Sequence, residues 1–126
     1  METTRPSKIR PRRGEIYLTA LDPTLGREIK KTRPALIVQN NTYNRLSGMT
    51  IVAPITSTVR FPLSPVHVLL AADRTTGLSV TSVALLDQIR AVDQRRLVKC
   101  LGTIDEATLE QVDEAIKITL GLMRLE

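Results

Sequence analysis

Hydrophobic and polar positions along the chain change their spacing near residue 103. Before that point the apolar residues form short runs, rich in Val, Ile and Leu, between loops that carry Pro, Gly, Asn and Asp. Such runs are typical of β-strands, and the loop residues are typical of turns. We expect strands at 15–21, 35–39, 50–56, 66–70, 82–86 and 88–92, loops at 22–33, 40–48 and 57–65, and a short helical turn near 94–97.

Pro54 stands inside the expected strand 50–56. A proline has no amide hydrogen to donate to a neighbouring strand, so it is confined to sheet edges and bulges. We therefore expect an edge or a bulge at this position.

Beyond residue 103 the apolar residues recur at three- and four-residue steps, which predicts one apolar face of a helix. The residues on that face are Leu109, Val112, Ile116, Leu120 and Met123. Thr103 and Glu106 match a capping box that would begin the helix. Strands followed by one terminal helix favour an α+β fold, mainly β, with an antiparallel sheet or small barrel and a C-terminal helix.

Composition limits the choice further. A chain of 126 residues fits one domain, and only three residues are aromatic, so aliphatic side chains must build the core. Cys100 is the single cysteine, which excludes a disulfide within the chain and suits a reducing, cytoplasmic location. No apolar run approaches the roughly 18 residues that cross a membrane, and no signal peptide is expected.

The net charge of +5 is unevenly distributed. Residues 1–13 and 14–104 are both basic, whereas residues 105–126 are acidic. We expect 1–12 to be a disordered basic arm and 13–126 to be a single domain. The basic body fits an anionic partner such as RNA or an acidic protein, and a solvated surface accounts for the charge equally well.

Several kinds of chemistry are not supported. The chain has neither a glycine-rich phosphate loop nor a nucleophile elbow, and its only histidine, His67, is expected to be structural or on the surface. No set of His, Asp and Glu has the spacing of metal ligands, so we expect no metal and no cofactor. What remains is a basic loop with one carboxylate, formed by Arg27, Glu28, Lys30, Lys31 and Arg33.

Such a loop could cut RNA without a metal ion. The 2′-hydroxyl of RNA attacks the adjacent phosphate if a base accepts its proton, positive charge stabilises the transition state, and the leaving oxygen is protonated. A carboxylate beside guanidinium groups meets the first two needs. Most basic loops are solvated surface, and this alternative stays open for the residues taken alone.

Five blocks of the sequence resemble the MazF/PemK family of toxins, in the order in which that family carries them. Arg13-Gly14-Glu15 resembles the family's opening strand, and Arg33-Pro34 its second strand. The five blocks are 13–17, 22–28, 31–40, 51–56 and 85–93. The chain departs from the pattern at Arg27, where Ser is common, and at 29–31, where a Gln- and Gly-rich stretch is usual; these departures put the cleavage sequence in doubt.

The resemblance implies an SH3-like small barrel of twisted antiparallel strands, the plasmid-maintenance toxin fold shared by MazF, PemK and CcdB. It implies a homodimeric toxin of a type II toxin–antitoxin system. Its activity would be sequence-specific, metal-independent cleavage of single-stranded RNA, leaving a 2′,3′-cyclic phosphate and a 5′-hydroxyl. A small acidic, MazE-like antitoxin would occupy the RNA groove.

The resemblance also assigns residues. Arg33 and Thr56 fall on the family's main catalytic positions, and Glu28 on a third that some members use. Arg33 would stabilise the phosphorane, Thr56 would donate a hydrogen bond to a phosphate oxygen, and Glu28 would be the base. The candidate RNA-binding residues are Lys30, Lys31, Arg27, Gln88, Asn40, Tyr43 and Phe61, of which Tyr43 and Phe61 are possible stacking partners.

Other interpretations stay open. Thr56 and Gln88 are also ordinary strand residues, and Arg33 could form a structural ion pair with Glu28 or Asp87. A non-enzymatic toxin of the same fold that binds DNA gyrase would need a C-terminal Trp-Gly-Ile, and the chain has no Trp. An inactive SH3-like module that binds RNA or protein is the third possibility.

Overall fold

The computed structural model describes residues 10–21 and 32–125. Its elements, in chain order, are β1 (Glu15–Thr19), β2 (Arg33–Ile37), α1 (Asn41–Leu46), β3 (Met49–Thr56), β4 (His67–Leu70), β5 (Ser82–Leu85), η1 (Leu86–Gln88), β6 (Arg90–Asp93), η2 (Gln94–Arg96), β7 (Leu97–Thr103) and α2 (Glu106–Thr119). The two η elements are single 3-10 turns, and η2 confirms the turn expected near 94–97.

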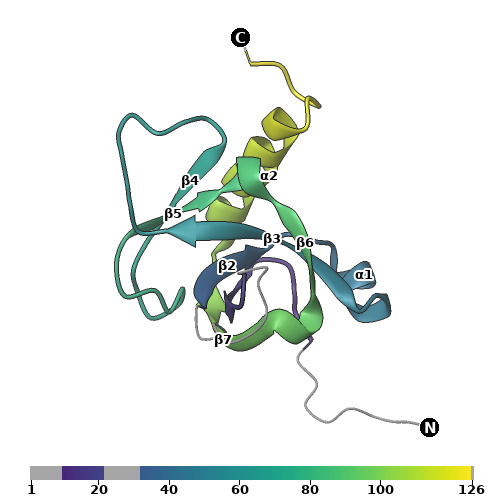
Figure 1. The fold of residues 1–126 in the computed structure, drawn as a ribbon. Coiled ribbons are helices and arrows are strands. Elements are labelled where there is room, and N and C mark those ends of the chain that lie inside the picture. Colours follow the sequence, from purple (N-terminus) through teal and green to yellow (C-terminus); the bar gives the residue numbers. More distant parts are fainter. Residues whose placement is uncertain (1–9, 22–31, 126) are drawn as a thin grey trace, which may run out of the picture.

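Every strand pairing in the described residues is antiparallel. The strand order is β4-β5-β3-β2-β1-β7, and β6 pairs with β3 beside this path. Figure 1 shows the strands crossing at steep angles and α2 standing against the sheet. The predicted fold class, an antiparallel sheet with a C-terminal helix, is therefore confirmed.

The sheet coils like a barrel without closing. Its two end strands are β4 and β7, and the loop between β4 and β5 crosses to β7, where Thr103 N donates to Thr75 O at 2.9 Å. The backbones approach so closely that glycine is required on both sides. A Cβ on Gly102 would come within 2.6 Å of the Thr76 carbonyl, and one on Gly77 within 2.6 Å of the Leu101 carbonyl carbon.

Pro54 lies where β3 changes its partner on one side. Residues Met49 to Val52 pair with β6, whereas Ile55 and Thr56 pair with β5. The expected edge or bulge is therefore a gap between two partner strands, in a strand that is central to the sheet. Because proline falls in this gap, its missing amide hydrogen costs no ladder bond there.

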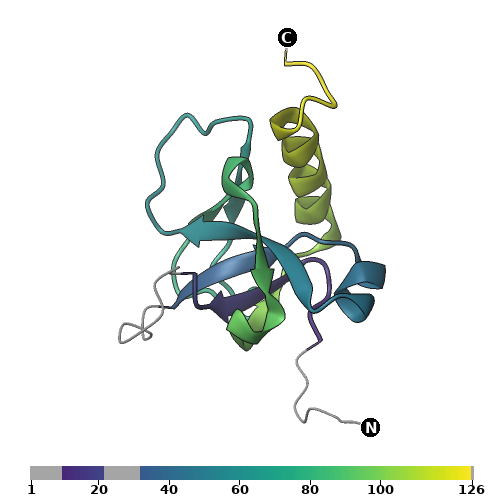
Figure 2. The same cartoon turned by 45° about the vertical axis from the view of Figure 1, so that its right-hand side comes forward.

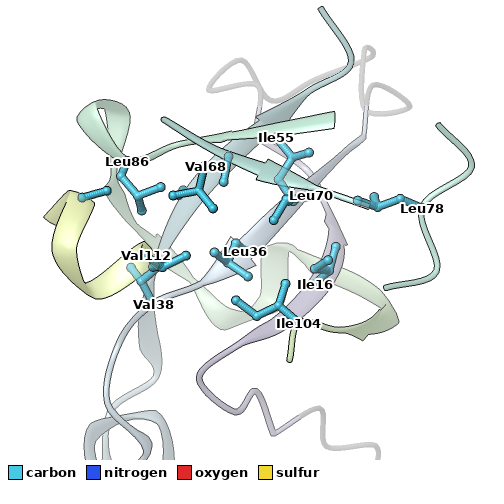
Figure 3. Close-up of a cluster of buried hydrophobic side chains, with 13 residues drawn as sticks. Ile16, Leu36, Val38, Ile55, Val68, Leu70, Leu78, Leu86, Ile104 and Val112 are labelled. Atoms are coloured by element: carbon cyan, nitrogen blue, oxygen red, sulfur yellow. The ribbon is translucent and has the colours of Figure 1, made fainter. Parts of the chain in front are cut away.

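Apolar side chains form one cluster on each face of the sheet, and the larger one lies under α2 (Figure 3). This cluster contains Ile16, Leu36, Val38, Ala53, Ile55, Val68, Leu70, Leu78, Ala84, Leu86, Ile104, Val112 and Ala115. The smaller one contains Tyr17, Ala35, Ile37, Val52, Val92 and Leu97. Residues next to each other in a strand point to opposite faces, so Leu36 belongs to the first cluster and Ala35 and Ile37 to the second.

The predicted capping box is wrong. Thr103 ends β7 and donates its hydroxyl to Gly14 O at 3.1 Å, while Asp105 caps α2 by accepting from Thr108 N at 2.8 Å. Both residues are of a capping type, and pairing with Glu15 in the β1–β7 ladder keeps Thr103 in a strand. The helix also ends early, so that Leu120 is its C-cap and is exposed.

A helix and a strand were missed, in addition to the short turn η1. The loop expected at 40–48 contains α1, whose six residues are too few to show a periodic pattern and are held by tertiary bonds, such as Thr50 Oγ1 to Asn44 Oδ1 at 2.7 Å. β7 was not expected, because its residues do not alternate between buried and exposed; Leu97 is buried and the next three are exposed. Pairing with β1, which is invisible in the local pattern, makes it a strand.

Arg13 ties the start of the domain to both helices. Its Nε donates to Val38 O at 2.8 Å, its Nη2 contacts Asp113 Oδ1 at 2.7 Å, and its N–H donates to Asn41 Oδ1 at 2.7 Å. The side chain is only 25 % exposed, so the bond to Val38 is largely shielded from water.

We expect Arg13→Ala to lower the free energy of unfolding by about 1–2 kcal/mol, because a backbone carbonyl loses its donor and a half-buried ion pair is broken. Asp113→Ala removes only the ion pair and should cost less than about 1 kcal/mol. Urea denaturation measures both variants. Equal losses would show that the Val38 bond contributes nothing.

The predicted disordered arm at 1–12 lies outside the described residues except for 10–12, and the predicted loop at 22–33 lies outside them except for 32 and 33. Within the part of the chain that the structure covers, no helix is long and apolar enough to cross a membrane.

Candidate active site

Arg33 and Thr56 lie at the same end of two neighbouring strands of the sheet. Arg33 begins β2 and Thr56 ends β3, and these strands pair with Ala35 opposite Pro54. Continuing that antiparallel register by two residues sets Arg33 opposite Thr56 on the same face. Directly opposite residues have Cβ atoms about 4.5–5.5 Å apart, so both side chains can reach one phosphate group.

The same register extends to both neighbouring strands. Thr19 of β1 pairs with Arg33, and Val83 of β5 pairs with Thr56. Thr19 is fully buried and Val83 nearly so, whereas Arg33 is exposed and Thr56 is half-buried. We call the side of the sheet that carries these residues the Arg33 face; it is the face of the smaller apolar cluster, opposite α2.

The hydroxyl of Thr56 already takes part in a turn. Its Oγ1 accepts from Thr58 N at 3.1 Å. Because that bond uses the oxygen as an acceptor, the hydroxyl hydrogen remains available to donate. Thr56 can therefore donate to a phosphate oxygen while the turn fixes the position of its oxygen.

Four predicted site residues lie outside the described part of the chain: Arg27, Glu28, Lys30 and Lys31. The alternative ion pair between Arg33 and Glu28 lies outside it as well. Among the residues that the structure covers, no ion pair joins Arg33 to Asp87, whose carboxylate instead contacts His67, with Oδ1 3.1 Å from Nε2.

His67 and Asp87 are a pair that the sequence did not indicate. His67 begins β4 opposite Leu85, on the Arg33 face, and Asp87 lies in the η1 turn that follows β5. The 20 residues between them in sequence hid the contact. The pair adds an imidazole and a carboxylate, held together, to the Arg33 face.

Gln88 is exposed at the end of η1, two residues before Arg90, the residue that pairs with Val52 on β3. The η1 turn connects β5 to β6, the two strands that pair with β3 on either side of Pro54, so Gln88 lies near this gap. Phe61 is 72 % exposed in the loop that follows Thr56. Both positions are compatible with the predicted RNA contacts.

Asn40 and Tyr43 lie far from Arg33 and Thr56 within one chain. Asn40 is the N-cap of α1 and accepts from Tyr43 N at 2.8 Å, and α1 precedes the start of β3, whereas Thr56 ends that strand. Eight residues of extended strand span roughly 23 Å. Figures 1 and 2 show α1 at one end of β3 and the loop that contains Phe61 at the other.

Two other potential nucleophiles on the Arg33 face are held in their neutral forms. Burial, with the Glu15 carboxylate as the next cause, raises the pKa of the Tyr17 phenol. Burial and then Glu15 also raise the pKa of the Cys100 thiol. Neither group therefore supplies an anion near neutral pH.

The carboxyl group of Asp93 has a pKa well below its ordinary value. Bonds from the Arg95 side chain, at 2.9 and 3.0 Å, and from Arg95 N, at 2.8 Å, lower its pKa from 3.8 to about 2. Since its pKa is lower in the folded than in the unfolded chain, the pair contributes stability above about pH 4, and this contribution is lost as the pH falls toward 2.

A carboxyl ¹³C NMR titration should therefore place the midpoint of Asp93 near 2, and Arg95→Ala should move it back toward 3.8. The effect on stability should be small, because the pair faces water. A wild-type midpoint near 4 would show that the pair does not persist in solution.

Residues 10–21 and 32–125 contain no group of three His, Cys, Asp or Glu side chains that could hold a metal ion. The donors that gather on the Arg33 face are instead a guanidinium and a hydroxyl, which suit an anionic phosphate.

Comparison with known proteins agrees with this arrangement. Residues 12–120 match the family described as PemK-like, MazF-like toxin of type II toxin-antitoxin system. The chain is 39% identical over 112 residues to Endoribonuclease EndoA of Bacillus subtilis, covering 89% of this chain and 96% of the relative. It is 40% identical over 111 residues to Endoribonuclease MazF of Staphylococcus epidermidis, covering 88% and 92%.

Solved structures show the same fold. A mycobacterial endoribonuclease in complex with its cognate antitoxin aligns with a TM-score of 0.73 at 27% identity, over 91% of this chain and 99% of that one. MazF from Deinococcus radiodurans aligns with a TM-score of 0.72 at 29% identity, over 90% and 99%.

Proposed function

Because the chain belongs to the family of PemK-like, MazF-like toxins of type II toxin–antitoxin systems, we propose that it is an endoribonuclease that cleaves single-stranded RNA without a metal ion. The observation that carries this proposal is the register that sets Arg33 opposite Thr56. Its relatives EndoA and MazF bear the name endoribonuclease, and the chain spans nearly their whole length.

In the proposed reaction the 2′-hydroxyl of the RNA attacks the neighbouring phosphorus. The bond from phosphorus to the 5′-oxygen of the next nucleotide breaks, leaving a 2′,3′-cyclic phosphate and a 5′-hydroxyl. Arg33 binds two non-bridging oxygens as negative charge builds up on them, and Thr56 donates to one of them. A guanidinium does not readily lose a proton in proteins, so we assign Arg33 to charge stabilisation.

Two groups are candidates for the proton transfers. Glu28 is our proposal for the base, on the resemblance alone, since it lies outside the described residues. The His67–Asp87 pair lies on the same face, about two strands from Pro54, and is a second source or acceptor of protons. Since strands are about 4.8 Å apart, it is near enough for a bound nucleotide to touch.

The experiment is a cleavage assay on a long single-stranded RNA in excess EDTA. We expect full activity, and we expect Thr56→Val to lower kcat by about tenfold or more, because one hydrogen bond to the phosphate is lost. Thr42→Val, on the exposed surface of α1, is the matched control and should change nothing. Activity that disappears with EDTA would overturn the metal-free mechanism.

We also propose an acidic antitoxin as the partner and a homodimer as the active form. The mycobacterial relative was solved in complex with its cognate antitoxin. An acidic peptide that covers the Arg33 face should bind more weakly as salt rises, and charge reversal at Lys30 and Lys31 should weaken it further. Exposed Leu120, Leu122 and Leu125 are apolar surface that a second chain could bury, which sedimentation analysis would test.

The two alternatives have less support. A gyrase poison of the same fold would need the C-terminal Trp-Gly-Ile, and the chain has no Trp. A binding module without activity would bind RNA and leave it intact under all conditions, so the cleavage assay separates it from the proposed enzyme.

A further inference from the structure

Two arginine side chains donate hydrogen bonds to the backbone just after β1. Nη1 of Arg96 donates to Ala20 O at 3.0 Å, and Ala20 N donates in return to Arg96 O at 2.9 Å. Nη1 of Arg90 donates to the next carbonyl, Leu21 O, at 3.0 Å. The two arginines belong to η2 and β6, and they lie 76 and 69 residues further along the chain than the carbonyls that they bind.

Of the two residues that accept these bonds, Leu21 lies on the Arg33 face. Leu21 is half-buried and packs against the smaller apolar cluster, which includes Val92 and Leu97. The backbone that follows β1 is therefore held in two ways. The side chain of Leu21 packs on the smaller apolar cluster, and Arg96 of η2 and Arg90 of β6 donate hydrogen bonds to the carbonyls.

These hydrogen bonds lie next to the strand pair that contains Arg33. Thr19 pairs with Arg33, and this is the last pair of the β1–β2 ladder. The ends of a ladder open most easily, since a terminal pair has a neighbour on one side only. Hydrogen bonds that keep the backbone at Ala20 from fraying therefore also keep the terminal pair of Thr19 and Arg33 closed, and so keep Arg33 near Thr56.

We propose that Arg90 and Arg96 are positioning residues that fix Arg33 by clamping Ala20 and Leu21, an inference that rests on the proposed function. They act on the reaction through β1 and need not touch the phosphate. Errors of about 1 Å in the position of a catalytic group cost roughly a hundredfold in rate, so loosening this clamp should lower kcat by about 10- to 100-fold.

The competing role for these arginines is direct contact with the RNA backbone, which their charge would permit. The two roles differ in salt dependence. A lost phosphate contact lowers the slope of log affinity against log salt by about one and weakens binding uniformly, whereas a lost clamp leaves both unchanged. The roles differ also in the free protein, where only a clamp protects the backbone of β1.

The test compares Arg90→Met, Arg90→Lys and Arg96→Met with Arg95→Met as the control. Methionine keeps an apolar stem and removes the donors. Arg95 is the matched control because its side chain is 88 % exposed and pairs with Asp93 on its own turn. Two measurements are made on each full-length variant: hydrogen exchange of the Ala20 amide without RNA, and kcat, KM and salt slope with single-stranded RNA.

We expect Arg90→Met and Arg96→Met to speed exchange at Ala20 by about tenfold or more, while exchange at Val38, whose amide bonds to Ile51 O, stays unchanged. Both should lower kcat with little change in KM or salt slope, Arg90→Lys should restore part of the rate, and Arg95→Met should match wild type. Unchanged exchange at Ala20 would overturn the clamp, and so would a loss seen only in KM and salt slope.

Failure of the proposed function would look different. Wild-type protein that cuts no RNA would refute the enzyme, while exchange at Ala20 would still show whether the two arginines hold β1. A variant whose amides at both Ala20 and Val38 exchange faster is globally destabilised. In that case Arg90→Lys is the deciding variant. If it restores slow exchange at Ala20 but does not restore kcat, the proposed positioning role of Arg90 is wrong.

Discussion

Arg33→Ala is expected to lower kcat for RNA cleavage by about 100- to 1000-fold while the protein stays folded. The guanidinium supplies the positive charge on which stabilisation of the phosphorane depends, and removing one such preorganised donor costs this much in other enzymes. Arg33 is exposed at the start of β2, so the loss of its side chain leaves no cavity.

Two further variants separate charge from geometry. Arg33→Lys keeps the charge and loses the forked pair of donors, so it should retain only part of the activity. Arg45→Ala removes an exposed arginine from α1, at the other end of β3, and should leave kcat unchanged. Similar losses in Arg33→Ala and Arg45→Ala would mean that only the total charge matters.

Gly102→Ala is expected to destabilise the protein strongly. The new Cβ would overlap with Thr75 O and come within 2.6 Å of the Thr76 carbonyl, and both contacts are to backbone. The loop between β4 and β5 would have to move off β7, breaking the bond from Thr103 N to Thr75 O. We expect a loss of about 3 kcal/mol or more in the free energy of unfolding.

Gly48→Ala is the matched control, because a Cβ there would meet nothing within 4 Å. It should leave stability within about 0.5 kcal/mol of wild type, or raise it slightly. Thermal and urea unfolding measure both variants. If Gly102→Ala were as stable as Gly48→Ala, the loop would not pack on β7 in solution as closely as the structure shows.

Local pattern was enough to predict most strands, since short aliphatic runs alternate with turn residues. It could not predict β7, whose exposed Val98, Lys99 and Cys100 become a strand only by pairing with β1. The capping box at Thr103 was predicted wrongly for the same reason: Thr103 pairs with Glu15 of β1 and so belongs to the sheet, although its residue type suits a helix cap. Long-range pairing overrides local preference in both places.

In the candidate site, too, some residues could be predicted from the sequence and others could not. Resemblance indicated Arg33 and Thr56, and the strand register now supplies a geometric reason why the two could act together. The contacts of Asp87 with His67, and of Arg90 and Arg96 with the end of β1, join residues 20 to 76 positions apart, so no spacing in the sequence could reveal them.

The most direct test of the central claim, that the RNA's own 2′-hydroxyl is the nucleophile, uses a substrate with a single 2′-deoxy nucleotide at a mapped cleavage site. The assay is run in excess EDTA, and the ends of the products are identified. We expect the all-ribose RNA to yield a 2′,3′-cyclic phosphate and a 5′-hydroxyl, and the 2′-deoxy RNA to remain intact at that site. Cleavage of the 2′-deoxy RNA at a similar rate, or a 5′-phosphate on the product, would contradict the account.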